Sequence, residues 1–128
     1  MRNPRLLFFI WNKNPFFVNT KGKKVGEAMI IVHVDTLVVP EKEEEYVKAM
    51  KSLMEATQKE PGNISYNFSK HMGEEHRYLI AEVWESPEAS DIHEEAAPFK
   101  TFMKLSMEQK FAARPPKVIK FEGEISPN

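Results

Sequence analysis

Cysteine is absent from this chain of 128 residues. The absence excludes a disulfide framework, a thiolate nucleophile and any metal site built on cysteine. It also favours a cytoplasmic protein, because small secreted domains commonly depend on disulfides. No long hydrophobic run is present either, since the apolar stretch at residues 6–11 is short and is followed by Asn and Lys. We therefore expect neither a membrane span nor a signal peptide.

Basic residues are scarce over most of the chain. Residues 1–28 carry six Lys or Arg and one acid, whereas residues 29–128 carry twelve Lys or Arg and eighteen acids. This acidic body argues against nucleic acid as a partner, because phosphates require a basic surface. The hydrophobic content of 41% and the charged content of 29% are those of an ordinary globular domain.

The first 28 residues follow neither the period of a strand nor that of a helix. They form a predicted N-terminal extension, either upstream sequence translated ahead of a natural start at Met29 or an arm whose aromatic residues cover the domain. Residues 29–124 form the predicted domain, and residues 125–128 form a C-terminal tail.

The spacing of apolar residues predicts the order β-α-β-β-α-β. We expect Ile92 on the buried face of its helix, and Ile119 and Phe121 to point inward from the last strand. The predicted elements are a strand at 29–39, a helix at about 41–59, a hairpin with strands near 64–69 and 78–84, a helix from 86 to about 112 that is interrupted at Pro98, and a strand at 117–122.

This order is typical of the ferredoxin-like α+β fold, a four-stranded antiparallel sheet with both helices on one face. Both central strands are apolar on two sides, so the face without helices also needs a cover. The simplest cover is a second copy of the same sheet. We expect a homodimer in which the two sheets pack face to face as a dimeric α+β barrel.

Four short motifs follow one another between residues 60 and 100. They are Glu60-Pro61-Gly62 with Tyr66, then Glu82-x-Trp84-Glu85-Ser86, then His93, and finally Pro98-Phe99-Lys100. In this order and spacing the chain resembles the antibiotic biosynthesis monooxygenase (ABM) family of dimeric α+β barrels. The resemblance covers about residues 29–124.

The resemblance implies a cavity in each subunit between the sheet and the helices. Characterised members include cofactor-free oxygenases of phenolic or quinol-type compounds, an isomerase of a sugar-phosphate-like compound, and a haem-degrading branch. Family membership fixes the fold better than the reaction. We expect a cofactor-independent monooxygenase that uses O2 on a small aromatic substrate. The alternatives are an acid/base isomerase of a small hydroxyketone, with Arg77 or Lys100 binding a phosphate, and a non-catalytic small-molecule-binding dimer.

Two residues are the candidate catalytic groups. Glu82 shares a strand face with apolar residues, where a carboxylate is costly unless it is paired. The resemblance places His93 at the cavity, where it would be the general base, with Glu82 fixing its tautomer. Each could instead be a satisfied structural residue. The expected pocket lining, which would equally suit a plain core, is Tyr66, Trp84, Phe99, Phe102 and Met103.

We predict no metal and no haem. His71 and His76 lie near acids in a polar hairpin that presets no ligand geometry. The proximal haem histidine of the haem-degrading branch matches Met103, which is not a ligand of that type. His33 and Asp35 share one face of the first strand, either toward the pocket or at the dimer seam.

Overall fold

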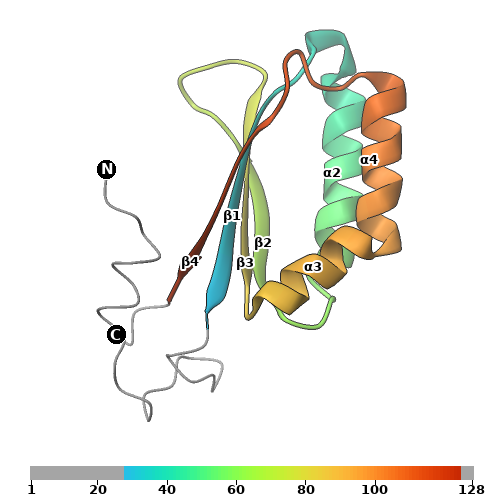
Figure 1. The fold of residues 1–128 in the computed structure, drawn as a ribbon. Helices are drawn as coiled ribbons and strands as arrows, with labels where there is room; N and C mark the ends of the chain where they lie inside the picture. The colour runs from blue at the N-terminus through green and yellow to red at the C-terminus, as the bar shows by residue number, and fades with distance from the viewer. Residues whose placement is uncertain (1–27, 125–128) are drawn as a thin grey trace.

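The computed structural model describes residues 28–124 of the chain. These residues form a sheet of four antiparallel strands in the order β2-β3-β1-β4, and all the helices cover one face of it (Figure 1). The predicted ferredoxin-like α+β fold is confirmed. The elements are β1 (Met29–Leu37), the short 3-10 helix η1 (Pro40–Lys42), α2 (Glu43–Thr57), β2 (Asn63–Lys70), β3 (Arg77–Trp84), α3 (Pro87–Glu95), α4 (Ala97–Gln109) and β4 (Lys117–Gly123).

The predicted extension at residues 1–28 and the tail at 125–128 lie outside the described residues, apart from residue 28.

Helix α2 buries one stripe, formed by Tyr46, Met50, Leu53 and Thr57, as its helical spacing predicts. The helix ends two residues earlier than expected.

Helix α3 begins at a serine cap, where the Ser86 hydroxyl accepts a hydrogen bond from the Ala89 N–H at 3.1 Å. The chain leaves the helix at Ala96 and starts again as α4, with Pro98 in the first turn. The prediction for Ile92 is wrong, because its side chain is 64% exposed. The buried stripe of this short helix consists of Ala89, Ser90 and His93, which leaves Ile92 on the outer side.

The register of the strands assigns each side chain to one of two sheet faces. Pairing of β1 with β3 and β4 puts Val32, Glu82 and Lys120 in one row, on the face toward the helices. His33 pairs with Ile119 and lies on the opposite, open face. The prediction that Ile119 and Phe121 point inward is therefore wrong, because β4 turns Val118 and Lys120 toward the helices instead.

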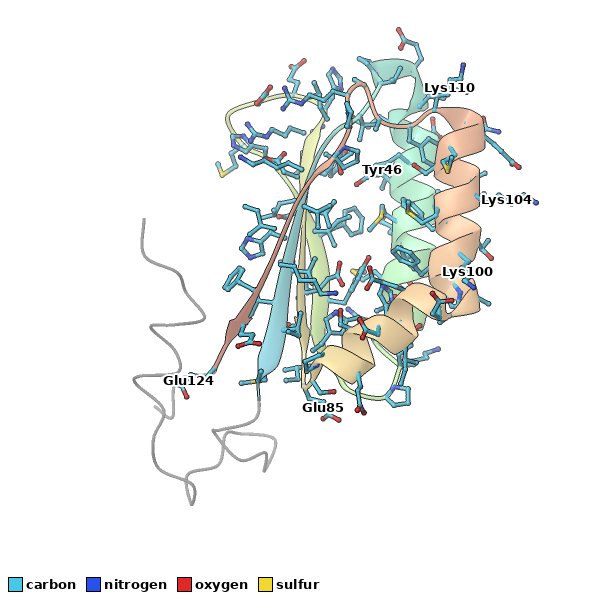
Figure 2. The ribbon with its side chains drawn as sticks, in the orientation of Figure 1. Tyr46, Glu85, Lys100, Lys104, Lys110 and Glu124 are labelled. Carbon is cyan, nitrogen blue, oxygen red and sulfur yellow. The ribbon has the colours of Figure 1, made fainter. Side chains whose placement is uncertain are left out.

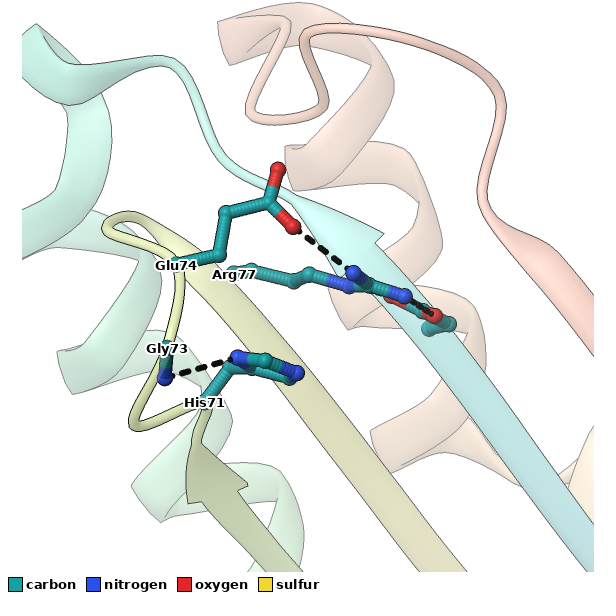
Figure 3. Close-up of polar contacts among 5 residues, drawn as sticks. His71, Gly73, Glu74 and Arg77 are labelled. Atoms are coloured by element: carbon teal, nitrogen blue, oxygen red, sulfur yellow. Dashed lines mark hydrogen bonds and ion pairs between the residues drawn. The ribbon is translucent and has the colours of Figure 1, made fainter.

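The open face carries an ion-pair network at one end. Arg77 donates from Nε and Nη2 to the two carboxylate oxygens of Asp35, at 2.9 and 2.5 Å. It also donates from Nη1 to Glu74 at 2.7 Å (Figure 3). The guanidinium beside Asp35 holds the pKa of that carboxyl below its usual range. His33 and Asp35 therefore lie away from the pocket.

Candidate functional site

A cavity of about 720 Å³ lies between the sheet and the helices. This volume is in the range of small-molecule sites. Its floor is the helix-facing side of the four strands, and its walls come from α2, α3, α4 and the connection from α4 to β4. Most of the lining is apolar, and α4 closes it loosely, because none of the residues of that helix is buried.

His93 brings a buried imidazole to this cavity. The side chain is 3% exposed, and Nδ1 lies 2.8 Å from Oε1 of Glu60. An ionised carboxylate only accepts, so Nδ1–H is the donor and Nε2 of the neutral ring keeps its lone pair. Nε2 is buried without a hydrogen-bond partner among residues 28–124. The pair therefore leaves one ring nitrogen free to receive a proton from a ligand.

The turn after α2 fixes Glu60, a residue that the sequence patterns did not single out as functional. The Glu60 N–H donates to the Thr57 carbonyl at 2.9 Å, and the Glu85 N–H donates to the Gly62 carbonyl at 2.9 Å. Gly62 has a φ of +81° and would place a Cβ only 2.5 Å from that of Ala89. The turn therefore needs glycine so that Glu60 can lie against α3.

Glu82 is buried at 7% exposure but does not hold the tautomer of His93. Its Oε1 accepts a hydrogen bond from Trp84 Nε1 at 2.9 Å. Burial raises the pKa of the Glu82 carboxyl, while the hydrogen bond from Trp84 acts in the opposite direction. The expected role as the partner of His93 falls to Glu60 instead, and Glu82 is a second acidic group in the cavity.

Four of the five expected pocket residues line the cavity: Tyr66, Phe99, Phe102 and Met103. Trp84 is fully buried and is not among the lining residues. Its ring packs against His93, with centroids 4.7 Å apart, and Phe99 contacts His93 at 5.1 Å. These two ring contacts hold the imidazole in place. Burial also raises the pKa of the Tyr66 hydroxyl, which keeps it protonated.

Charged residues that line the cavity occur near both ends of α4. Glu94 and Lys120 form an ion pair of 3.2 Å between α3 and β4. Lys110 and Arg114 lie in the segment that follows α4. Neither of the cations considered from sequence lines the cavity: Arg77 is bound on the open face, and Lys100 pairs with Glu95 at 3.0 Å.

The polar hairpin between β2 and β3 uses its histidines locally. The Gly73 N–H donates to His71 Nδ1 at 3.0 Å (Figure 3), and His76 Nδ1 lies 2.5 Å from Glu43. No group of three or more metal-ligating side chains occurs within residues 28–124.

None of the described helices combines the length and the apolar character needed to cross a membrane.

Comparison with known proteins decides the family. Residues 29–105 match the family described as antibiotic biosynthesis monooxygenase. The chain belongs to this family. The protein YcnE of Bacillus subtilis, which is provisionally assigned as a monooxygenase, is 33% identical to this chain over 75 residues. The match covers 59% of this chain and 79% of YcnE.

Solved structures of family members and related proteins share the fold. An antibiotic biosynthesis monooxygenase homologue from Nitrosomonas europaea superposes with a TM-score of 0.70 at 22% identity, covering 74% of this chain and 89% of that one. A conserved protein from Methanosarcina mazei gives a TM-score of 0.71 at 26% identity, with coverage of 76% and 94%. The resemblance drawn from the motifs is thereby confirmed.

Proposed function

We propose that the protein is a cofactor-independent monooxygenase of a small phenolic or quinol-type compound. The buried His93–Glu60 pair supports this proposal most directly, because it leaves Nε2 as a base without a hydrogen-bond partner among residues 28–124, in a cavity whose lining is mostly apolar. Membership in the antibiotic biosynthesis monooxygenase family and the similarity to YcnE agree with it.

The chemistry requires little beyond a base and a dry pocket. His93 Nε2 takes the proton of the substrate hydroxyl, and the resulting electron-rich anion passes an electron to O2. Recombination places one oxygen atom on the ring as a carbonyl, and the other leaves as water. The substrate itself supplies the electrons, so no external reductant enters. Phe99, Phe102 and Tyr66 would hold the ring and exclude water from the intermediates.

Oxygen uptake tests the proposal. The purified full-length chain is given a panel of hydroquinones and naphthols, and O2 consumption is compared with the autoxidation of each compound alone. We expect at least one compound to be consumed faster with protein, and labelled O2 to deliver one atom to the product and one to water. No acceleration with any compound would reject the monooxygenase. Turnover of a hydroxyketone without O2 would then support the isomerase, and binding without turnover the non-catalytic alternative.

We also propose that the open sheet face forms a homodimer interface. Leu79 on β3 and Ile119 on β4 are 37% and 48% exposed there, beside the half-buried Ile31, Val83 and Phe121. An apolar sheet face of this kind is an association surface. Leu79→Lys should shift the sedimentation mass from dimer to monomer, whereas Met72→Lys in the exposed hairpin should not. A monomeric wild type would contradict the proposal.

A further inference from the structure

One row of residues crosses the cavity floor from edge to edge of the sheet. Tyr66 pairs with Glu82, Glu82 pairs with Val32, and Val32 pairs with Lys120. All four side chains line the cavity. Neighbouring strands lie about 4.8 Å apart, so the backbones of Glu82 and Lys120 are roughly 10 Å apart, with Val32 between them. An aromatic ring resting on Val32 would have a carboxyl at one side and an ammonium at the other.

Lys120 faces the cavity against the expected pattern of its strand. In β4 the apolar Ile119 and Phe121 occupy the open face, and the lysine points toward the helices. Its Nζ lies 3.2 Å from Glu94 Oε2, the residue after His93 on α3. Both side chains remain accessible, at 38% and 49% exposure, so the pair is weak and can exchange partners. Lys120 and Glu94 are also close enough to influence the Glu82 carboxyl.

We propose that Lys120 binds an anionic substituent of the substrate, so that the protein selects hydroxyarenes that carry a carboxylate. The carboxylate replaces Glu94 as the partner of Lys120, and Glu94 turns to solvent. The ring lies over Val32, and its hydroxyl points toward the His93 and Glu82 end of the row. This inference rests on the proposed function in one respect: the role of His93 as the base decides that the hydroxyl end of the substrate lies at His93.

The other cations that line the cavity fit this role less well. Lys110 and Arg114 follow the C-terminal end of α4, whereas α3 packs at its N-terminal end (Figures 1 and 2). Thirteen helical residues span about 20 Å. A one- or two-ring compound held at His93 does not reach across that length, but it does reach Lys120.

Two variants with opposite expected effects test the proposal. A hydroxynaphthoate and the naphthol of the same ring system are titrated calorimetrically into the full-length protein. We expect the carboxylate to bind the wild type about three- to tenfold more tightly, and this preference to shrink as salt rises. Lys120→Gln should abolish the preference. Glu94→Gln, which frees Lys120, should strengthen it. Binding of naphthol should change little in either variant.

A purely structural ion pair predicts a different outcome, because both substitutions break it and both should then act in the same direction. The matched control is the exposed Lys100–Glu95 pair, whose lysine is labelled in Figure 2. Lys100→Gln should leave both affinities unchanged. Equal binding of the two ligands to the wild type, a preference that survives in Lys120→Gln, or binding of neither ligand would overturn the proposal.

Oxygen uptake separates this inference from the monooxygenase itself. A carboxylate preference that depends on Lys120, found without O2 consumption, would reject the oxygenase and leave the binding role standing. Consumption of neutral quinols at the same rate by wild type and Lys120→Gln, without any preference for carboxylates, would support the oxygenase and reject the role of Lys120.

Discussion

Two histidines in this protein have the same kind of partner in different surroundings. His93 Nδ1 meets Glu60 at 2.8 Å and His76 Nδ1 meets Glu43 at 2.5 Å, each across 33 residues of sequence. The His93 side chain is 3% exposed, whereas that of His76 is 34% exposed. The second nitrogen of His76 lies 3.6 Å from the solvent-exposed Glu75.

The comparison shows that the partner alone does not define the role. Around His76 both nitrogens meet acids at the surface, which clamps the hairpin to the start of α2. Around His93 one nitrogen is held and the other is buried in a cavity without a partner in the described part of the chain. The same kind of His–Glu contact therefore has a structural role at the surface, whereas in the cavity it leaves the second nitrogen of His93 as a candidate base.

The largest effect should follow from removing the imidazole in the cavity. His93→Ala should lower kcat/KM for the quinol that is oxidised best by about 10²- to 10⁴-fold, the usual contribution of a general base. His76→Ala is the matched control and should leave kcat/KM unchanged. Circular dichroism of both variants checks the fold. Equal rates in wild type and His93→Ala would remove the assignment of His93 as the base.

Replacing the carboxylate behind the base should have a smaller effect. Glu60→Gln keeps the shape of the turn but no longer stabilises the protonated imidazole, so we expect on the order of a tenfold to hundredfold loss in kcat. Steady-state O2 uptake measures it. The control is Glu88→Gln in the exposed first turn of α3. A loss confined to KM would instead assign Glu60 to substrate binding.

The turn that holds Glu60 should tolerate substitution poorly. Gly62→Ala meets both a positive φ and a Cβ at 2.5 Å, so we expect about 1–3 kcal/mol less stability in urea unfolding. Gly73→Ala is the matched change in the hairpin beside His76, where the nearest atom is His71 Cε1 at 3.3 Å. It should cost much less, and equal losses would contradict the rigidity of the Glu60 turn.

The raised pKa of Glu82 predicts a pH dependence of stability. Its ordinary value is 4.5, so below that pH the carboxyl is protonated in both the folded and unfolded protein. As pH rises through the raised folded pKa, ionisation in the buried site costs stability. Relative to the wild type, Glu82→Gln should therefore gain thermal stability between pH 4.5 and neutrality. A melting-temperature difference that stays constant with pH would contradict this.

The smallest effect belongs to the exposed clamp. Hydrogen bonds from His76 and Lys70 hold the pKa of Glu43 below 4.5. This contribution is present above the unfolded pKa and is lost as pH falls through the folded one. Glu43→Gln should cost at most about 1 kcal/mol at neutral pH and nothing in strong acid. Thermal melts at several pH values measure the difference, and a larger loss at low pH would be inconsistent with the clamp.

The periodicity of apolar residues was sufficient to predict the fold, because it extends over long segments of the chain. The two-sided apolar pattern of residues 29–39 and 78–84 predicted the two central strands, and Pro98 predicted the break between the helices. The faces of the short β4 were misread, because its alternating apolar residues Ile119 and Phe121 were expected to face the helices, whereas pairing with β1 puts them on the open face.

The site was only half predictable. His93 and most of the aromatic lining followed from the motifs, but Glu60 lies in a turn that shows no periodicity, and its contact with His93 exists only after α3 docks. Lys120 was missed for a related reason. Its position in the cavity depends on the register of an edge strand and not on local sequence.

Helix α4 has a dynamic consequence of its own. Its aromatic and aliphatic side chains lie over a cavity, so none of its residues is buried, while α2 buries four. Local opening costs least where few apolar contacts must be broken. Amide hydrogens of α4 should therefore exchange with solvent sooner than those of α2 and become protected when the cavity is filled. Ligand would then enter through local opening of α4, at a rate set by how often that helix separates from the sheet.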